Sequence, residues 1–348
     1  MSLYVLNESD NSVQHAGSKA RNDIAGIAET LGWRPLSVRK IFSTREWDKI
    51  RAIPTVYWDW SHIPRLLESG DVILLQFPPD TFLKAAFAAV PSIKKMKRHG
   101  IHIVMLIHDL DSLRGQGKRL EATFLPLADV IIAHNDHMIS FLRKQGFQQP
   151  CISLDIFDYL VPHGTQICEP ISGIDIAGNL DPYKTKYIYE MAKKRPELPF
   201  NLYGPNFDRN SLASHWYRGS FTPEQLLSHL SGSFGLVWDG DSPDTCLGLQ
   251  GEYLRFNNPH KLSLYIAAGK PVIIWDKAAE ASFVTRHNVG IAASSIYEGV
   301  DTAMSLSADE LAAMTANAKE LGNCLQRGDF TKAAIQKAVS ILTEGEHN

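Results

Sequence analysis

The sequence predicts an α/β protein with two domains, and three observations support this class. Short apolar runs alternate with helical patterns along the whole chain, beginning at residues 3–6. The alternation starts again near residue 174, after a stretch interrupted by Pro162, Gly164 and Pro170. The 348 residues suit two domains of roughly 150 residues better than one core. Strands that alternate with helices form parallel sheets, so we expect two Rossmann-like domains that face a central cleft.

The predicted boundaries follow from this change of pattern. We place the first domain at residues 1–158 and the second at residues 171–328. Residues 155–170 have little regular pattern, which is typical of a connection between domains. A final helix at residues 329–348 is expected to pack back on the first domain.

Composition argues against several classes of protein. A net charge of −3 and a pI near 6.5 give no electrostatic basis for binding nucleic acid. The four cysteines form no CxxC pair, so we expect neither a zinc site nor a disulfide framework. No signal peptide precedes the first strand, and every apolar run is too short to span a membrane. We therefore expect a soluble, cytoplasmic protein.

The first domain shows a repeating strand and helix pattern. After the strand at residues 3–6, Ser18 is a plausible N-cap for a helix closed by Gly32. A helix from Thr81 carries Pro91 inside its pattern, which predicts an interruption there. The remaining predicted strands of this domain are residues 71–77, 101–107, 130–133 and 151–154.

Two segments of the first domain suggest surface contacts as well as ordinary structure. Residues 57–60 combine three aromatic side chains with a carboxylate, which can form a sugar-binding face, although packing is the commoner use of such a cluster. Residues 94–99 form a basic helix end. Such an end can contact anionic lipid, or it can be a solvated terminus that the helix dipole favours.

The second domain repeats the pattern. Its predicted strands are residues 174–177, 200–203, 234–238 and 272–275. Capping boxes at Thr222/Gln225 and Ser307/Glu310 predict two helix starts, the second helix ending near Gly322. A last helix runs from residue 330 to about residue 344.

The stretch at residues 257–275 combines structural and chemical signals. Asn258 is a predicted N-cap with Pro259 in the first helical position, and Gly269 is a predicted helix stop. His260 and Lys261 fall in the first turn, where a cation opposes the helix dipole. The arrangement suits a phosphate on the helix N-terminus. A solvated lysine that tolerates the small penalty is the alternative.

Asp109 is the candidate general base. It follows the strand at residues 101–107, and the carboxyl ends of parallel strands face the ligand crevice in α/β folds. A helix-capping carboxylate is the alternative. Neither a GxGxxG nor a P-loop fingerprint is present, so a dehydrogenase and a P-loop kinase are disfavoured.

Four runs of residues resemble a known family. They are His15-Ala16-Gly17-Ser18-Lys19-Ala20, Ile107-His108-Asp109, residues 235–240 and residues 257–269. The chain resembles bacterial sugar transferases of the GT-B fold. That group includes β-1,6-galactofuranosyltransferases and the glucosyltransferases that extend GlcNAc on serine-rich-repeat adhesins. The similarity covers nearly the whole chain, and its last two runs are the most specific.

The resemblance implies a UDP-sugar donor bound mostly by the second domain. Lys184 would be the basic residue after the Gly-Asn turn, and Lys261 the helix-start lysine, with both neutralising the departing diphosphate. Gly17 and Ser18 would belong to a loop that closes over the donor, and Phe221 would lie near the base. The expected donor-binding set is completed by Asn179, Tyr203, Asp239, Asn257, Asn258 and His260. Asp239-Gly240-Asp241 matches a DxD metal motif, but we expect no metal because the two lysines already serve the diphosphate.

The predicted function is transfer of a hexose, with galactofuranose as one candidate, from a UDP-sugar to a hydroxyl of a glycan, glycopeptide or lipid-linked acceptor. The family's products imply inversion at the sugar, with one carboxylate acting as base. The alternative is a non-catalytic GT-B partner protein in a glycosylation complex. Two further partners stay open, namely a second copy of the chain and the inner face of a membrane.

Overall fold

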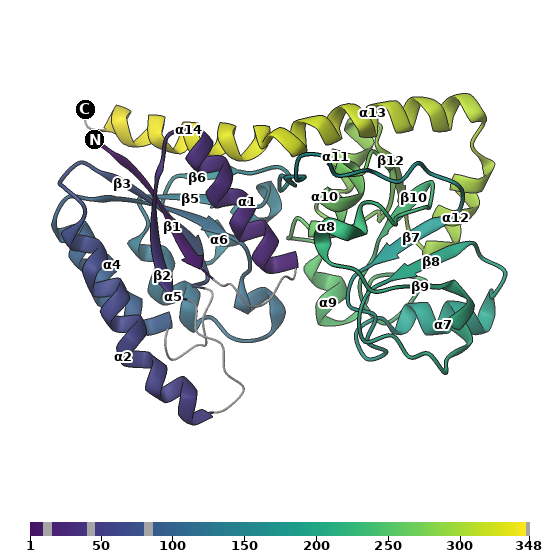
Figure 1. The fold of residues 1–348 in the computed structure, drawn as a ribbon, viewed down its shortest axis with the longest axis horizontal. Coiled ribbons are helices and arrows are strands. Elements are labelled where there is room, and N and C mark those ends of the chain that lie inside the picture. The colour runs from purple at the N-terminus through teal and green to yellow at the C-terminus, as the bar shows by residue number, and fades with distance from the viewer. Residues whose placement is uncertain (10–15, 40–45, 80–85, 346–348) are drawn as a thin grey trace. The chain divides into compact units, whose positions relative to one another are not determined.

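The chain divides into two compact units. The computed structural model describes residues 1–9, 16–39, 46–79 and 86–345. The first unit comprises Met1–Leu154 together with Phe330–Asn348, and the second comprises Asp155–Asp329 (Figure 1). The chain therefore leaves the first unit at the start of the irregular segment 155–170, and its last helix belongs to the first unit.

A parallel six-stranded sheet forms the centre of the first unit. Its strand order is β2-β1-β3-β4-β5-β6, and every neighbouring pair is parallel. The order reverses between β1 and β3. The strands are β1 (Leu3–Ser9), β2 (Arg34–Arg39), β3 (Val72–Phe77), β4 (His102–Ile107), β5 (Val130–Ala133) and β6 (Cys151–Ser153).

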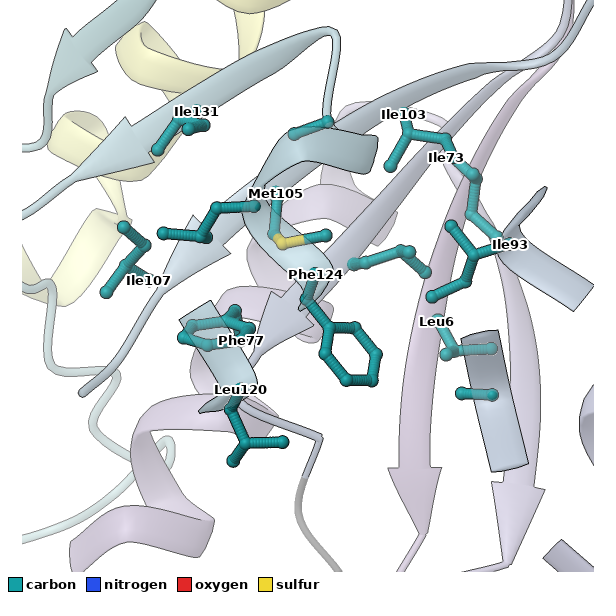
Figure 2. Packing of buried hydrophobic residues seen from close by; sticks show 14 of the residues in the cluster. Leu6, Ile73, Phe77, Ile93, Ile103, Met105, Ile107, Leu120, Phe124 and Ile131 are labelled. Carbon is teal, nitrogen blue, oxygen red and sulfur yellow. The ribbon is translucent and has the colours of Figure 1, made fainter. Parts of the chain in front are cut away.

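Helices complete the first unit. Inward-facing residues of β3, β4 and β5 pack with Leu120 and Phe124 in one apolar core (Figure 2). Among the described residues, the helices are α1 (Ala16–Thr30), α2 (Glu46–His62), α4 (Val90–Arg98), α5 (Arg119–Phe124), α6 (Asp136–Lys144) and α14 (Asp329–Gly345). Short 3-10 turns are η1 (Ile63–Arg65), η2 (Phe87–Ala89), η3 (Asp111–Arg114) and η4 (Leu125–Leu127).

One prediction for the first unit was wrong. Helix α1 begins at Ala16, so Ser18 lies inside the helix and is not its N-cap. The interruption predicted near Pro91 is present, because the helical residue Ala86 is followed by the 3-10 turn at Phe87–Ala89 before α4 begins. Pro91 itself occupies the first turn of α4, where its missing N–H is harmless. Residues 57–60 lie within α2, and the short 3-10 turn η1 follows them. The start of the helix predicted from Thr81 lies outside the described residues.

The second unit has a sheet with order β12-β11-β10-β7-β8-β9, again with parallel neighbours only. Counted within the unit, this is the 3-2-1-4-5-6 order of dinucleotide-binding folds. The order reverses between β7 and β10. The strands are β7 (Ile174–Ala177), β8 (Phe200–Tyr203), β9 (Tyr217–Gly219), β10 (Phe234–Val237), β11 (Val272–Trp275) and β12 (Gly290–Ala293).

Helix α10 is central to this unit. Gly235 leaves room for the ring of Tyr265, because a Cβ there would lie 2.1 Å from the ring. The hydroxyl of Tyr265 accepts the N–H of Ala177 at 2.7 Å, which fixes α10 against β7. The helices of the unit are α7 (Lys186–Lys194), α8 (Pro223–Leu226), α9 (Gly248–Tyr253), α10 (His260–Ala267), α11 (Ala281–Arg286), α12 (Ile296–Ser305) and α13 (Ala308–Arg327), with a 3-10 turn η5 (Leu212–Trp216).

Both predicted capping boxes are confirmed, but one helix end is not. Thr222 with Gln225 caps α8, and Ser307 with Glu310 caps α13. Helix α13 continues past Gly322 to Arg327 and ends at Gly328 with φ 78°. Gly322 is needed for close packing, since a Cβ there would lie 2.3 Å from the carbonyl oxygen of Ile266 in α10. Within the described residues, no helix is long and apolar enough to span a membrane.

Candidate functional site

The second sheet has one position where a parallel α/β fold usually binds a ligand. Strand β7 has β8 on one side and β10 on the other, so the order reverses between β7 and β10. Ligands of such sheets bind outside the carboxyl ends of the strands at the reversal. Residues 178–184 follow β7 there, and residues 238–241 follow β10.

Lys261 connects the first turn of α10 to the end of β10. Its Nζ donates to the carbonyl oxygen of Trp238 at 2.8 Å and to Oδ1 of Asp239 at 2.9 Å. The side chains of Lys261 and Asp239 are 19% and 20% exposed, so solvent reaches the pair. An ammonium group has three protons, and two are used here. One proton of Lys261 is therefore left for a further acceptor.

The basic residue after the Gly-Asn turn is placed differently from the prediction. Lys184 is exposed, and its side chain makes no hydrogen bond or ion pair with any other described residue. Two positions later, in the first turn of α7, Nζ of Lys186 lies 3.7 Å from Oδ1 of Asp241. Lys186 is therefore a second cation, besides Lys261, that the structure brings to the loop after β10, and sequence reasoning missed it.

Two glycines hold the turns after β7 and β8 against each other. A Cβ on Gly204, which has φ 152°, would lie 1.7 Å from the carbonyl oxygen of Gly178. Oδ1 of Asn179 accepts the N–H of Asp181 and the side-chain amide of Asn206, both at 3.1 Å. Asn179 therefore shapes the edge at which β7 ends, and its own amide group faces outward with an exposed side chain.

Asn258 does not cap α10 as predicted. The N-cap is Pro259, and no side chain caps this helix. The Asn258 side-chain amide donates instead to the carbonyl oxygen of Asp155 at 3.0 Å. The ring of His260 packs against Phe157 in a tilted arrangement, with ring centroids 4.6 Å apart. Asn258 and His260, which the sequence predicted to bind the donor, thus contact the chain segment 155–157 of the second unit.

Asn257, unlike Asn258, has a side-chain oxygen that is left for a ligand. Its Oδ1 is buried and has no hydrogen-bond partner among the described residues. Its backbone N–H donates to Tyr253 at 3.2 Å, which fixes its position before α10. A buried amide oxygen without a donor is costly, so Asn257 is suited to accept a hydrogen bond from a ligand.

Tyr203 and Phe221 lie near each other beyond β8. Tyr203 is buried, its hydroxyl is 3.1 Å from Oγ of Ser231, and burial raises its pKa. The rings of Tyr203 and Phe221 have centroids 6.4 Å apart, and Phe221 stacks on His229 at 3.7 Å. Phe221 can offer one ring face to a ligand, whereas Tyr203 supports it from within.

Both carboxylates of the DxD run face a lysine. Asp239 pairs with Lys261, and Asp241 is close to Lys186. No group of three or more His, Cys, Asp or Glu side chains in the described part of the chain could hold a metal ion. The donor set is therefore two carboxylates already balanced by two cations.

Asp109 follows β4 in the first unit. Its Oδ2 lies 3.0 Å from Nη1 of Arg114, and its side chain is 39% exposed. It is no helix cap, because the N-cap of η3 is Leu110. Burial raises the pKa of nearby Asp111, and the charge of Asp109 adds to this while Arg114 opposes it.

His108 is positioned by the neighbouring strand. Its Nε2 lies 2.7 Å from Oε1 of Gln76, and the amide nitrogen of Gln76 donates to the carbonyl oxygen of Arg21 at 3.2 Å. Because Gln76 therefore presents an acceptor, Nε2 of His108 carries the proton. That nitrogen cannot act as a base.

The predicted donor loop is only partly described. Gly17 and Ser18 lie in the first turns of α1, and Ser18 is buried. Next to them, Lys19 pairs with Asp23 at 2.7 Å. His15 lies outside the described residues.

Comparison with protein families accounts for almost the whole chain. The N-terminal domain of the glucosyltransferase 3-like family matches residues 2–156, and the C-terminal domain of that family matches residues 174–338. The β-1,6-galactofuranosyltransferase WbbI of Escherichia coli K12 is 33% identical over 98% of this chain and 99% of its own. Glucosyltransferase 3 of Streptococcus parasanguinis is 25% identical over 97% of this chain and 98% of its own.

Solved structures agree on the fold. An α-glucosyltransferase in complex with UDP and a 13-mer DNA superposes with a TM-score of 0.61 at 14% identity, covering 99% of both chains. An α,α-trehalose-phosphate synthase from Burkholderia vietnamiensis gives a TM-score of 0.59 at 9% identity, covering 98% of this chain and 100% of its own. Two parallel α/β units with such neighbours confirm the predicted GT-B fold. The chain therefore belongs to the glucosyltransferase 3-like family, and it is a glycosyltransferase.

Proposed function

We propose that this protein transfers a hexose from a UDP-sugar to a hydroxyl of a glycan, glycopeptide or lipid-linked acceptor. The observation that carries the proposal is Lys261, a partly exposed cation with one unused proton in the first turn of α10. It lies where the strand order of a dinucleotide-binding type of sheet reverses. A diphosphate suits this position because it is an anion with several acceptor oxygens.

The leaving group is stabilised by cations in this proposal. The bond between the sugar and the diphosphate breaks, and Lys261 and Lys186 neutralise the charge that develops on the diphosphate oxygen. Asn257 accepts a hydrogen bond from the nucleotide or the sugar, and Phe221 stacks on the base. Gly17 and Ser18 belong to the part of the first unit that closes over the donor.

Asp109 is the proposed base, with inversion at the sugar carbon. The acceptor oxygen forms its bond to that carbon as the bond to UDP breaks, and the acceptor proton moves to Asp109. Arg114, with Nη1 3.0 Å from Oδ2 of Asp109, is the cation beside the proposed base.

Galactofuranose is the first donor sugar to test, because the 33% identical relative is a galactofuranosyltransferase. UDP release should be measured with UDP-galactofuranose, UDP-galactose, UDP-glucose and UDP-GlcNAc. Binding of UDP should then be measured by calorimetry for Lys261→Ala, which we expect to lose about 1–3 kcal/mol of affinity. Lys97→Ala is the matched control, because Lys97 also pairs with an aspartate, Asp129, in the first unit. Unchanged UDP affinity in a folded Lys261→Ala protein would remove the proposed site.

We also propose that no divalent metal takes part. The pairing of Asp239 and Asp241 with lysines supports this, since a metal would have to displace both cations. Transfer should survive EDTA at full rate. Loss of transfer with EDTA and its recovery with manganese or magnesium would assign the two carboxylates to a metal.

The non-catalytic alternative is set aside because the full-length relatives are transferases. We propose a cytoplasmic location at the inner face of the membrane, where a lipid-linked acceptor would be found. Self-association of the chain is a second proposal, and sedimentation velocity tests it.

A further inference from the structure

Helix α2 exposes an apolar face that the sugar-transfer chemistry does not use. Of the twelve large hydrophobic residues exposed in the described part of the chain, five lie on α2 and the turn after it. They are Trp47, Ile50, Tyr57, Trp58 and Leu66. Trp47 and Trp58 are 75% and 62% exposed, and the ring of Trp58 packs on one side against His62, with centroids 4.4 Å apart.

The helix has two apolar faces, and only one is needed for folding. Val56, Trp60 and Ile63 point into the core of the first unit. Trp47, Ile50 and Trp58 lie on the opposite face, at positions i, i+3 and i+11 of the helix. A helix that only covered a core would carry polar residues on its outer face. The outer face of α2 is therefore apolar surface that the fold of the first unit does not use.

The neighbouring helix adds positive charge beside this apolar surface. Helix α4 packs against α2 and η1, and the two helices are neighbours in Figure 1. Lys94 and Arg98 are exposed on α4 and Lys95 is half-buried, whereas Lys97 pairs with Asp129. α4 carries four cations and no acid, while the whole chain has a net charge of −3.

The charges of α2 itself do not oppose this. The sequence of α2 and η1 holds three acids and three bases, so it adds no net charge. Asp59 is bound by Arg39 at 2.7 Å, which holds the pKa of Asp59 below its usual value. The surface thus combines aromatic rings with excess positive charge. The name "α2/α4 face" is used below for Trp47, Ile50, Tyr57 and Trp58 with Lys94, Lys95 and Arg98.

We propose that the α2/α4 face docks the protein on an anionic membrane. Tryptophan and tyrosine favour the interface between water and lipid, and lysine and arginine bind anionic headgroups. Lys94 and Lys95 favour a lipid surface over a protein partner, because lysine is depleted at protein interfaces. The inference deepens the location proposed above, but vesicle binding is measured without sugar transfer, so either proposal can fail alone.

The full-length protein is to be sedimented with vesicles of phosphatidylcholine alone and of equal parts phosphatidylcholine and phosphatidylglycerol. We expect binding to the anionic vesicles only, and weaker binding at high salt. Trp47→Ser/Trp58→Ser should lower the partition at least tenfold. Lys94→Gln/Arg98→Gln should lower it about 25-fold, since each cation near the surface contributes about fivefold, or about 1 kcal/mol.

Matched controls lie in the second unit. Ile171→Ser/Leu212→Ser removes two equally exposed apolar residues, and Lys193→Gln/Lys194→Gln removes two cations from the last turn of α7. Neither control should change vesicle binding. All variants should transfer sugar to a soluble acceptor at the wild-type rate.

Two results would overturn the proposal. One is wild-type protein that stays in the supernatant with anionic vesicles. The other is an aromatic variant that binds vesicles like wild type but loses an oligomer in sedimentation velocity. In that case the α2/α4 face contacts a second copy of the chain.

Discussion

At the scale of single residues, the question is which lysine of the second unit binds the diphosphate. Lys186 and Lys184 differ by two positions, yet only Lys186 lies near Asp241, at 3.7 Å. We expect Lys186→Ala to weaken UDP binding about fivefold, because the diphosphate loses a cation and meets an unscreened Asp241. Lys184→Ala should change the affinity less than twofold. Calorimetry should compare the UDP affinities of the two variants. A larger loss of affinity in Lys184→Ala than in Lys186→Ala would restore the assignment to Lys184.

A second prediction at this scale concerns Asp109 as the proposed general base. Asp109→Asn keeps the shape of the side chain but cannot accept a proton, so transfer should slow by about 10²–10⁴-fold. UDP affinity should stay unchanged, because the proposed contacts with the diphosphate, Lys186 and Lys261, belong to the second unit. Asp136→Asn, an exposed aspartate in the first turn of α6, is the control. A rate near that of wild type would make Asp109 structural and move the search to Asp111 and His15.

At the scale of elements, a buried ion pair ties β7 to the end of α10. Asp175 and Lys270 are both almost completely buried, with Oδ2 and Nζ 3.8 Å apart. Burial raises the pKa of Asp175 to about 6 and lowers that of Lys270. Nζ of Lys270 also donates to the carbonyl oxygen of Gly232 at 2.5 Å.

Lys270→Met should destabilise the second unit by about 3–5 kcal/mol at pH 8, where it leaves a buried carboxylate unpaired. The pKa of Asp175 is raised in the folded state, so its carboxyl group favours folding at low pH and loses that contribution as pH rises through about 6. The penalty of Lys270→Met should therefore shrink at pH 5, where Asp175 can hold a proton. Urea unfolding at both pH values measures this, with Lys193→Met as an exposed control. Asp175→Asn/Lys270→Met should recover most of the loss at pH 8, and an equal penalty at both pH values would contradict the explanation.

The helices and strands that the sequence predicted well are those whose side chains are buried throughout. Strands such as β10 and β11 are buried throughout and read as continuous apolar runs, so they were found. Strand β2 buries only Val38, and α2 contains Pro54 and exposes an aromatic face, so neither gave a clear period. Gly322 was interpreted as a stop because sequence alone does not show that α10 lies against it.

In the candidate site, the sequence predicted the positions that depend on local signals and missed those that depend on distant contacts. The position of Lys261 followed from a helix start, which is a local signal. The roles of Asn258 and His260 depend on contacts with residues 155–157, about a hundred positions away in the chain. Choosing Lys186 over Lys184 requires knowing where the turn ends and α7 begins, and helix boundaries are the least certain part of any sequence-based prediction.

At the scale of the whole molecule, the first unit is built from two separate parts of the chain. Residues 330–348 belong with residues 1–154, whereas the second unit is one continuous segment. Helix α14 buries Thr331, Ala334, Ile335 and Ala338, at positions i, i+3, i+4 and i+7, which is the pattern of one packed helix face. The second unit therefore has its whole sheet and the proposed nucleotide contacts without α14.

A chain truncated after Asp329 should consequently lose stability in the first unit and keep UDP binding in the second. Limited proteolysis with mass spectrometry should find new early cleavage sites within residues 1–154 and none within residues 155–329. UDP affinity should stay within about twofold of the full chain, which is less than 0.5 kcal/mol, and sugar transfer should fall because Asp109 belongs to the weakened unit. Replacing the exposed Ser340 with Ala in the full chain is the control for a harmless change in α14. Cleavage that appears first in residues 155–329, or UDP binding that is lost with the helix, would show that α14 supports the second unit instead.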